Sequence, residues 1–519
     1  MSQQPMSNAD AGWFQMESPT NPMMIAGFFE FDRPMDYARL KATIEHRLLH
    51  FERFTQRVVK PRLSLHQHVW ETDPNFELES HLHRIALPAP GDLAALKGVI
   101  NDLASTPLDL ARPLWQFHLI EKYGEGCVLF CRLHHCIADG IALMHVLLSL
   151  CDDTADAPWP TPQPSKRRSS SSLVASLLSP ARWAMSTTRG LLQDGADLLQ
   201  HPTQAVQIAQ TTAGFAAALA RVTLMLPDSR TVFKGELSVA RRTAWSQPLP
   251  LDEVKAVGRA MGATVNDVIL ASVAGALRRY LESRGQAVDG VDVRAMVPVN
   301  IRPAEEALEK LGNHFGLVVL ALPVGVAEPQ DRLHELKRRM DALKRTPEAY
   351  VSYGIVQTIG MTPVEIERLV VKFYTSKTSA VMTNVAGPRH KLYLAGSPIK
   401  QVNFWVPQAA GIGLGISIFS YAGDVVLGVL ANARLVPDPE TIIDAFQAEF
   451  TALQALTVPQ ARVPDLGPGA VSHNGHDQSS APAGHCQALT KSGQPCKNMA
   501  LPGSTTCRVH AGVAAASQP

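Results

Sequence analysis

The sequence predicts a mixed α/β (α+β) fold built from two halves. Strand-like and helical patterns alternate over residues 1–153, a break in composition fills 154–230, and the alternation returns over 231–457. A chain of 519 residues is also too long for one compact core of ordinary size. We therefore expect two domains, followed by a polar, unstructured linker at 458–484 and a small module at 485–512.

The first half contains both kinds of element. Met24 to Phe31 is a short apolar run of the kind found in strands, and Cys127 to His135 predicts a buried strand. Tyr37 to His50 places apolar residues at helical spacing. These patterns predict a sheet with helices packed against it.

The connection between the halves begins with PWPTPQPSKRRSSSS, residues 158–172, which has the composition of a linker. Leu173 to Leu226 then contains Ala, Leu, Gln and Thr with few charges. Two interpretations remain open for this segment. It forms weakly amphipathic helices packed between the domains, or it forms a surface that rests on lipid.

The second half repeats the mixture of elements. Asn266 to Leu281 predicts a helix with an Asn-Asp start. Three apolar runs predict strands: Val291 to Val299, Leu317 to Leu322 and Gly413 to Phe419.

Composition bounds the class of protein. The net charge of +1 gives no reason to expect a nucleic-acid partner. The first residues lack the basic and apolar regions of a signal peptide, and the apolar runs are too short or too interrupted to span a bilayer. Seven cysteines without a secretory signal fit a reducing compartment better than a disulfide framework. We expect a cytoplasmic protein, with attachment to the inner membrane face or to lipid inclusions left open.

The segment RLHHCIADG, Arg132 to Gly140, carries the most distinctive chemistry. Residues alternate faces along a strand, so His134 and His135 are expected to point in opposite directions. Asp139 is placed to cap a helix that starts near Gly140. Glycine at that position permits a close approach or an unusual backbone angle.

Several interpretations of this segment are open. Adjacent histidines on a strand cannot easily ligate one ion, and no third ligand lies at familiar spacing, which disfavours a metal site. One imidazole presented at a strand end suits a general base near neutral pH. Taken alone, two histidines at a strand end are more often structural. Cys136 is a further candidate nucleophile, although its side chain should face away from His135.

A wider pattern favours the catalytic interpretation. HHxxxDG resembles the signature of acyltransferases that use coenzyme A thioesters, and also of peptide-synthetase condensation domains. Over residues 10–457 the chain resembles the bacterial wax ester synthase/diacylglycerol acyltransferase family. The segments that carry this resemblance are DAGWFQMESPTNPM, TPLDLARPLW, Val265–Asp267, VPVNIR followed by Leu311–Asn313, NVAGP, and Ser420–Tyr421.

The resemblance implies two chloramphenicol-acetyltransferase-like halves, each a mixed sheet with helices, and a tunnel between them. Acyl-CoA would enter from one side, and a fatty alcohol or diacylglycerol from the other. His135 would take the acceptor's hydroxyl proton and return it to the leaving thiolate, without a covalent acyl-enzyme and without a cofactor. The sequence contains no G-x-S-x-G nucleophile elbow, which agrees with this mechanism.

The same resemblance assigns the rest of the histidine motif. Asp139 would hold the turn and pair with an arginine, for which Arg302 is a candidate. Helix capping is the simpler role for Asp139, and both roles can hold together. Gly140 is a structural part of the motif, and His134 is expected to be structural too.

Four further residues are candidates for the site. Asn266 is implied as a site residue that could donate to the oxyanion, and its alternative role is a helix N-cap. Trp115 is a candidate substrate contact, and its alternative place is the core. Asn384 and Gly387 are also candidate substrate contacts, and their alternative is a simple turn.

The end of the chain carries a separate motif. Cys486, Cys496, Cys507 and His510 have the spacing C-x9-C-x10-C-x2-H. Three thiolates and one imidazole complete a closed tetrahedral zinc site. The segment resembles small Cys/His modules with CxAxTxxGxxC followed by CxxH. We expect either a structural zinc or free thiols in an unstructured tail.

The sequence leaves three candidate functions for the chain. The first is an O-acyltransferase that forms wax esters, triacylglycerol or both. The second is a CoA-dependent or condensation-type acyltransferase with a non-lipid acceptor, which would need a carrier-protein partner or a soluble acceptor. The third is a non-catalytic lipid-binding or scaffold protein, against which the intact His135 and Asp139 argue.

Overall fold

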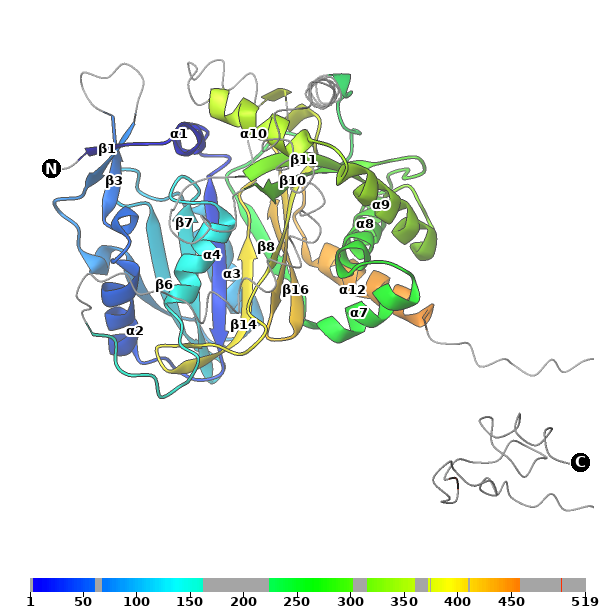
Figure 1. Ribbon diagram of the computed structural model, residues 1–519. Helices are drawn as coiled ribbons and strands as arrows, with labels where there is room; N and C mark the ends of the chain where they lie inside the picture. The colour runs from blue at the N-terminus through cyan, green and yellow to red at the C-terminus, as the bar shows by residue number, and fades with distance from the viewer. Residues whose placement is uncertain are drawn as a thin grey trace, which may run out of the picture. The chain divides into compact units, whose positions relative to one another are not determined.

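The computed structural model describes residues 3–60, 68–161, 224–301, 315–359, 372–373, 375–408, 411–457 and 496. Residues Met1–Pro459 cluster as one compact unit, and Gln460–Pro519 as another. The first unit contains two large mixed sheets that lie side by side, with helices packed on them (Figure 1). The predicted mixed α/β fold is confirmed.

The first sheet has six strands in the order β13-β14-β2-β7-β6-β5, and its β5–β6 pair is parallel. Its strands are β2 (Met24–Phe31), β5 (Leu82–Ala86), β6 (Trp115–Tyr123), β7 (Gly126–His134), β13 (Tyr393–Leu394) and β14 (Ser397–Trp405). The helices packed on it are α2 (Tyr37–Thr43) and α4 (Gly140–Ser149) on one face and α3 (Leu93–Ser105) on the other. A small sheet is formed by β1 (Gln3–Pro5), β3 (Gln56–Val59) and β4 (Val69–Thr72), and α1 (Asn8–Gln15) follows β1.

The second sheet has the strand order β11-β10-β12-β15-β16-β8, with β9 paired to β16. Its strands are β8 (Arg241–Trp245), β9 (Leu249–Pro250), β10 (Val293–Asn300), β11 (Phe315–Leu322), β12 (Ala380–Ala386), β15 (Leu414–Tyr421) and β16 (Asp424–Asn432). The described helices of this half are α7 (Leu251–Ala260), α8 (Val265–Ser283), α9 (Pro329–Leu343), α10 (Glu348–Ile359) and α12 (Glu440–Ala455). Figure 1 shows α7, α8, α9 and α12 gathered on the side of this sheet away from β7.

The division of the sequence at residue 231 does not divide the two sheets. β14 belongs to the second half, yet it pairs antiparallel with β2 of the first half, with Phe404 opposite Gly27. A Cβ atom added at Gly27 would lie 2.8 Å from the Asn403 carbonyl oxygen, so glycine permits this close pairing. The expectation of one sheet for each half must therefore be corrected, because one strand pair crosses over.

The predicted elements agree with the observed ones within two residues for β2, β10, β11, β15 and α8. The helical pattern from Tyr37 to His50 is less regular, because α2 ends at Thr43 and a π-helical turn follows over Ile44–Leu48. Within the described ranges, no single helix has the length and hydropathy to cross a bilayer. The pair α7 and α8, bent by 94°, passes that test only when the two helices are combined.

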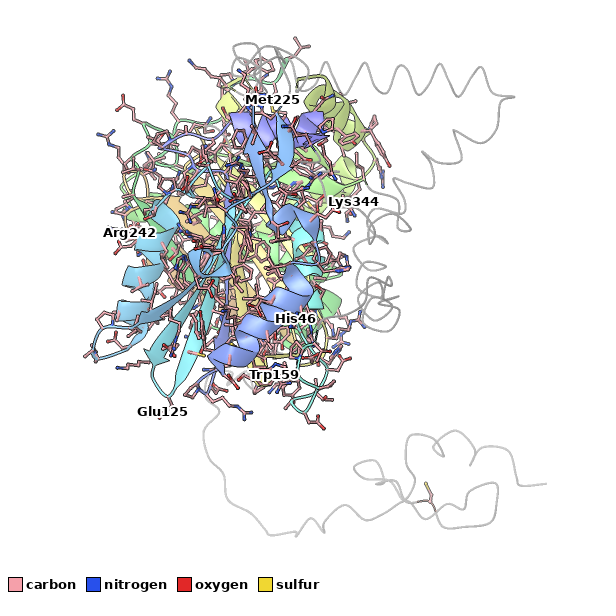
Figure 2. All side chains as sticks on the ribbon, turned by 90° about the vertical axis from the view of Figure 1, so that its left-hand side faces the viewer. His46, Glu125, Trp159, Met225, Arg242 and Lys344 are labelled. Atoms are coloured by element: carbon pink, nitrogen blue, oxygen red, sulfur yellow. The ribbon has the colours of Figure 1, made fainter. Side chains whose placement is uncertain are left out.

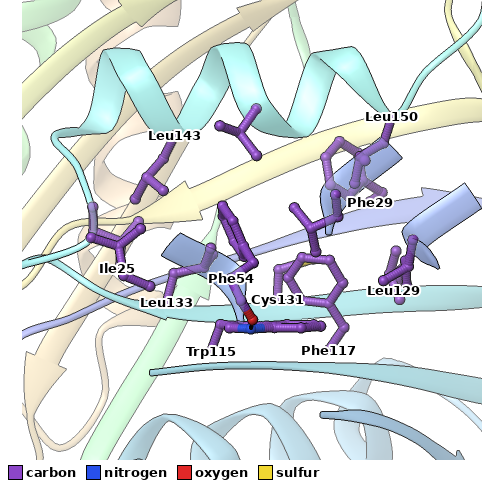
Figure 3. Packing of buried hydrophobic residues seen from close by; sticks show 14 of the residues in the cluster. Ile25, Phe29, Phe54, Trp115, Phe117, Leu129, Cys131, Leu133, Leu143 and Leu150 are labelled. Carbon is purple, nitrogen blue, oxygen red and sulfur yellow. Dashed lines mark hydrogen bonds between the residues drawn. The ribbon is translucent and has the colours of Figure 1, made fainter. Parts of the chain in front are cut away.

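The core of the first half explains the apolar character of β7. Leu129, Cys131 and Leu133 pack toward α4 among the aromatic rings of β6, as Figure 3 shows. Phe130 faces the other way, into the cluster that includes α3 and Trp405. This alternation follows the pattern predicted from the sequence, and the strand ends at His134, the first histidine of the motif.

Candidate active site

His135 lies one residue beyond β7, at the contact between the two halves. Its backbone N–H donates to the Met23 carbonyl at 2.8 Å. Its imidazole stacks on Trp13 of α1, with ring centroids 4.2 Å apart and planes 24° apart. On another side it meets the edge of Phe315, the first residue of β11, at 5.8 Å. The ring is held between both halves and the residue is only 8% exposed.

His134 is fully buried and has other partners. Its Nδ1 accepts the Cys136 N–H at 3.1 Å, so the neutral ring carries its proton on Nε2. That Nε2 lies 3.4 Å from a carboxylate oxygen of Glu17. Both histidine rings contact α1, since His134 lies beside Phe14 while His135 stacks on the preceding tryptophan. These contacts support the structural role expected for His134.

Glu17 connects the two histidines, and the sequence did not single it out. Its carboxylate faces His134 and also accepts the backbone N–H of Met23 through a short hydrogen bond. Met23 in turn accepts the N–H of His135. The segment from Glu17 to Met23 therefore fixes the position of the His135 backbone.

Arg241, the first residue of β8, holds the same segment from the second half. Its guanidinium donates to the Thr20 carbonyl at 2.6 Å and to Asn21 Oδ1 at 3.5 Å. Burial lowers the pKa of Arg241 to about 10. The negative charge of the nearby Glu17 carboxylate acts in the opposite direction and raises this pKa, by less than burial lowers it. The side chain remains cationic at neutral pH and links the halves beside the candidate base.

Asp139 is the N-cap of α4, as predicted. Its carboxylate accepts the Ala142 N–H at 2.9 Å, and the residue is 6% exposed. Arg302, the candidate partner of Asp139, lies outside the described residues. Gly140 does not have a positive φ, and apart from its chain neighbours and the backbone of α4, no atom of the described residues lies within 4 Å of a Cβ atom built on it. Neither the unusual backbone angle nor the close approach that glycine permits is therefore found among the described residues.

Asn266 and Asn384 are brought together. The Asn384 Nδ2 group donates to Asn266 Oδ1 through a short hydrogen bond. Asn266 is not the N-cap of α8, because Thr264 caps this helix in a reciprocal pair with Asp267. With its oxygen accepting from Asn384, Asn266 has an NH₂ group of the right chemistry to donate to a substrate oxygen.

Strand register relates this amide pair to the base. Asn300 at the end of β10 is opposite Phe315, which contacts the His135 ring. β10 runs parallel to β12, with Ala295 opposite Ala380. Asn300 and Asn384 therefore lie toward the same ends of neighbouring strands.

Trp115 and Gly387 lie in packed surroundings. Trp115 is fully buried, and its indole N–H donates to the Phe54 carbonyl at 2.8 Å (Figure 3). Gly387 donates its N–H to the Ser420 carbonyl at 2.8 Å, and an added Cβ atom would collide with the ring of Phe419. These positions favour the packing alternatives, and substrate contact remains a prediction for both residues.

Cys136 is poorly suited to nucleophilic attack. It has no exposed surface, and burial raises the pKa of its thiol well above the ordinary value. A buried thiol that stays protonated is a weak nucleophile. Among the described residues there is no cluster of three metal-ligating side chains. Of the tail residues, Cys486, Cys507 and His510 lie outside the described part of the chain, while Cys496 is described and buried.

Comparison with known proteins identifies the family. Residues 6–269 match the wax ester synthase/diacylglycerol acyltransferase catalytic domain, and residues 311–454 match the WS/DGAT C-terminal domain. The chain belongs to this family. A Mycobacterium tuberculosis protein named as a diacylglycerol O-acyltransferase is 30% identical over 427 residues, which span 79% of this chain and 87% of that protein. The chain is thus an acyltransferase of the WS/DGAT family.

Solved structures support the fold. The wax ester synthase/diacylglycerol acyltransferase from Marinobacter aquaeolei VT8 aligns with a TM-score of 0.63 at 22% identity, covering 88% of this chain and 99% of that one. The starter condensation domain of rhizomide synthetase, solved with C8-CoA and Leu-SNAC, aligns with a TM-score of 0.55 at 14% identity, covering 88% and 94%. WS/DGAT enzymes and condensation domains thus share this architecture.

Proposed function

We propose that this chain transfers a long-chain acyl group from acyl-CoA to the hydroxyl of a fatty alcohol or of diacylglycerol. The products are a wax ester or triacylglycerol and free CoA. The observation that carries the proposal is the position of His135, whose ring is held between Trp13 of the first half and Phe315 of the second. An imidazole at the contact between the halves suits direct transfer between two substrates that approach from different sides.

In the proposed reaction His135 acts as general base. The imidazole takes the hydroxyl proton as the acceptor oxygen attacks the thioester carbonyl, and a C–O bond forms. The tetrahedral intermediate then breaks its C–S bond, and the imidazolium gives the proton to the leaving thiolate. Ester and CoA thiol are released, and the base returns to its starting state.

The surrounding residues support these steps. Asn266 is the proposed donor to the oxyanion, with its own amide oriented by Asn384. The stacked rings leave His135 only 8% exposed, which limits access of water to the thioester. Asp139 fixes the start of α4, the helix that follows the candidate base.

The substrate class is supported by the family and by general energetics. The relatives are named for diacylglycerol, and the structural neighbour from rhizomide synthetase was solved with an acyl-CoA. A long acyl chain gains roughly 0.8 kcal/mol for each methylene buried in an apolar site.

The test is release of CoA from palmitoyl-CoA with hexadecanol, with dioleoylglycerol and with no acceptor. We expect release that depends on a lipid acceptor, together with the matching wax ester or triacylglycerol in the lipid extract. The relative rates rank the two acceptors. Release with small alcohols or amines, and not with either lipid, would support the alternative acyltransferase with a non-lipid acceptor.

We also propose a structural zinc site in the C-terminal tail. Its support is the donor set, Cys486, Cys496, Cys507 and His510, which has the chemistry of a closed tetrahedral site. The expected metal content is about one zinc per chain. Cys507→Ser should lower it, whereas Cys127→Ser, which changes a buried thiol of the first sheet, should not. Equal zinc content in Cys507→Ser and the unchanged protein would contradict the site.

A further inference from the structure

Trp13 covers one face of the candidate base. Its indole stacks on the His135 imidazole, with ring centroids 4.2 Å apart and planes inclined by 24°. Phe315 contacts both rings, with its centroid 5.8 Å from that of the imidazole and 5.9 Å from that of the indole. Trp13 is itself buried, so three aromatic rings contact one another where the two halves meet.

The helix that carries Trp13 is fixed at both ends. Ser7 caps α1, since its hydroxyl oxygen accepts the Asp10 N–H at 3.1 Å. Just beyond the other end of α1, a carboxylate oxygen of Glu17 lies 3.4 Å from His134 Nε2. The position of the indole over the imidazole therefore follows from the position of the helix backbone.

The stacking does not block the ring nitrogens of His135. Proton transfer uses the lone pair of a ring nitrogen, which lies in the plane of the imidazole. The indole lies over the face of the ring and nearly parallel to that plane. Trp13 therefore does not compete with an acceptor hydroxyl for the base, and it acts on the base through the face of the ring.

The charge of that ring changes during the proposed reaction. His135 is neutral at the start and becomes an imidazolium as it takes the hydroxyl proton. The face of an indole attracts a cation that lies within about 6 Å of its centre, and the attraction is strongest at a desolvated site. His135 is 8% exposed, so this condition is met. The stack therefore stabilises the protonated ring more than the neutral one.

Ionised side chains also lie in this part of the fold. Asp10 and Glu17 belong to α1 and the residues that follow it, and Asp139 caps α4. Burial is the main cause that raises the pKa of the Cys136 thiol, next to the base. The charges of Asp10 and Glu17 raise it further, and that of Arg53 lowers it. These groups stay the same when only the indole is altered, so a difference between such variants reports on the indole.

We propose that Trp13 is a positioning residue that stabilises the imidazolium form of His135 by a cation–π interaction. The indole lowers the energy of the transition state, in which the imidazole carries charge, more than that of the enzyme before proton transfer. The inference rests on the proposed function, because it takes His135 as the base of acyl transfer.

The first test is acceptor-dependent CoA release as a function of pH. Trp13→Leu removes the aromatic face, and Trp13→Phe keeps a weaker one. We expect kcat to fall roughly five- to 30-fold in Trp13→Leu, and less in Trp13→Phe, with little change in KM. Without the stack the imidazolium loses its proton more easily. The acidic limb of kcat/KM should therefore move to lower pH by roughly one unit.

A second test separates charge from packing. Fluorine atoms on an indole withdraw electron density from the ring face and change its size little, so fluorinated tryptophans in place of Trp13 keep the packing and weaken the attraction for a cation. We expect kcat to fall stepwise as fluorine atoms are added. A loss of rate in Trp13→Leu with a constant kcat across the fluorinated series would assign Trp13 a packing role and overturn the proposal.

The matched control places the same fluorinated residues at Trp159, which is 50% exposed. Figure 1 shows α1 in the upper part of the first unit. Figure 2, which is turned about the vertical axis, shows Trp159 near the lower end of that unit, so the two positions are well separated. Fluorination of Trp159 should leave kcat unchanged.

The outcome is separable from the proposed function. The titration midpoint of His135 is measured without substrates, by NMR of the protein with ¹³C-labelled histidine, and its signal is assigned by its loss in His135→Ala. We expect the midpoint to fall in Trp13→Leu and along the fluorinated series. A constant midpoint in folded protein would overturn the proposal, whatever the rate of CoA release. A falling midpoint in a protein that releases no CoA would contradict the proposed function alone.

Discussion

At the scale of single residues, the base is held by contacts that lie far from it in sequence. The HHxxxDG motif predicts His135 as the base. The position of its backbone depends on Met23, whose carbonyl accepts the His135 N–H, and on Glu17, whose carboxylate accepts the Met23 N–H. Glu17 lies within DAGWFQMESPTNPM, a segment that indicates only a resemblance to the family. No local spacing links Glu17 to His134, so sequence reasoning could not find a contact that folding alone creates.

Removing Glu17 should lower the rate more than substrate binding. Glu17→Ala leaves the Met23 N–H without its acceptor and should lower kcat roughly 10- to 100-fold, with little change in KM, because the base is displaced. Glu17→Gln keeps an acceptor oxygen and should recover most of the rate. Steady-state kinetics check this, with the exposed Glu45→Ala as control. A Glu17→Ala enzyme with unchanged kcat would remove the positioning role.

At the scale of elements, the apolar periodicity predicts that a helix or strand is present better than it predicts the residues at which that element begins and ends. Runs such as Met24 to Phe31 match β2 because burial on a sheet imposes a continuous apolar pattern. The start of α8 differs from the prediction, because Thr264 and Asp267 form the cap. Asn266 accepts a hydrogen bond from Asn384 instead. Capping competes among neighbouring polar residues, and only the folded geometry decides which one bonds to the backbone.

Loss of the α4 cap should affect both stability and activity. Asp139→Ala removes the acceptor for the Ala142 N–H and should lower the free energy of unfolding by about 1 kcal/mol, while Asp139→Asn should keep most of it. Urea unfolding measures this. Asp92→Ala, which removes the corresponding cap from α3, should cost about as much stability without reducing CoA release. If Asp139→Ala released CoA as fast as Asp92→Ala and the unchanged protein, α4 would not position the site.

At the scale of the whole molecule, the halves are joined more closely than the sequence suggests. β14 crosses into the first sheet, and Arg241 reaches from β8 to Thr20. Pairing between residues as distant as Gly27 and Phe404 leaves no periodic signal in the chain. The motif order predicted the two halves, but only the fold shows that they share a sheet.

The fold should also be sensitive to acid through His118, which is buried between the first sheet and α3. Burial lowers its pKa to about 3, while an unfolded histidine has an ordinary value near 6.5. Between these values the unfolded chain binds a proton that the folded chain does not. Stability is therefore lost as the pH falls below about 6.5, by roughly 2 kcal/mol at pH 5.

Unfolding in urea at pH 7 and pH 5 checks this effect. His118→Phe should lose less stability on acidification than the unchanged protein, whereas His334→Phe, at an exposed position on α9, should behave like the unchanged protein. An equal loss in all three proteins would assign the acid sensitivity to other groups.

The role of His135 as the base is tested most directly by acceptor-dependent CoA release by His135→Ala, compared with His334→Ala at an exposed position on α9. We expect the rate to fall about 100-fold or more for His135→Ala in a protein that unfolds at the normal temperature, and to be unchanged for His334→Ala. A folded His135→Ala enzyme that still releases CoA at the normal acceptor-dependent rate would contradict the assignment of His135 as the base.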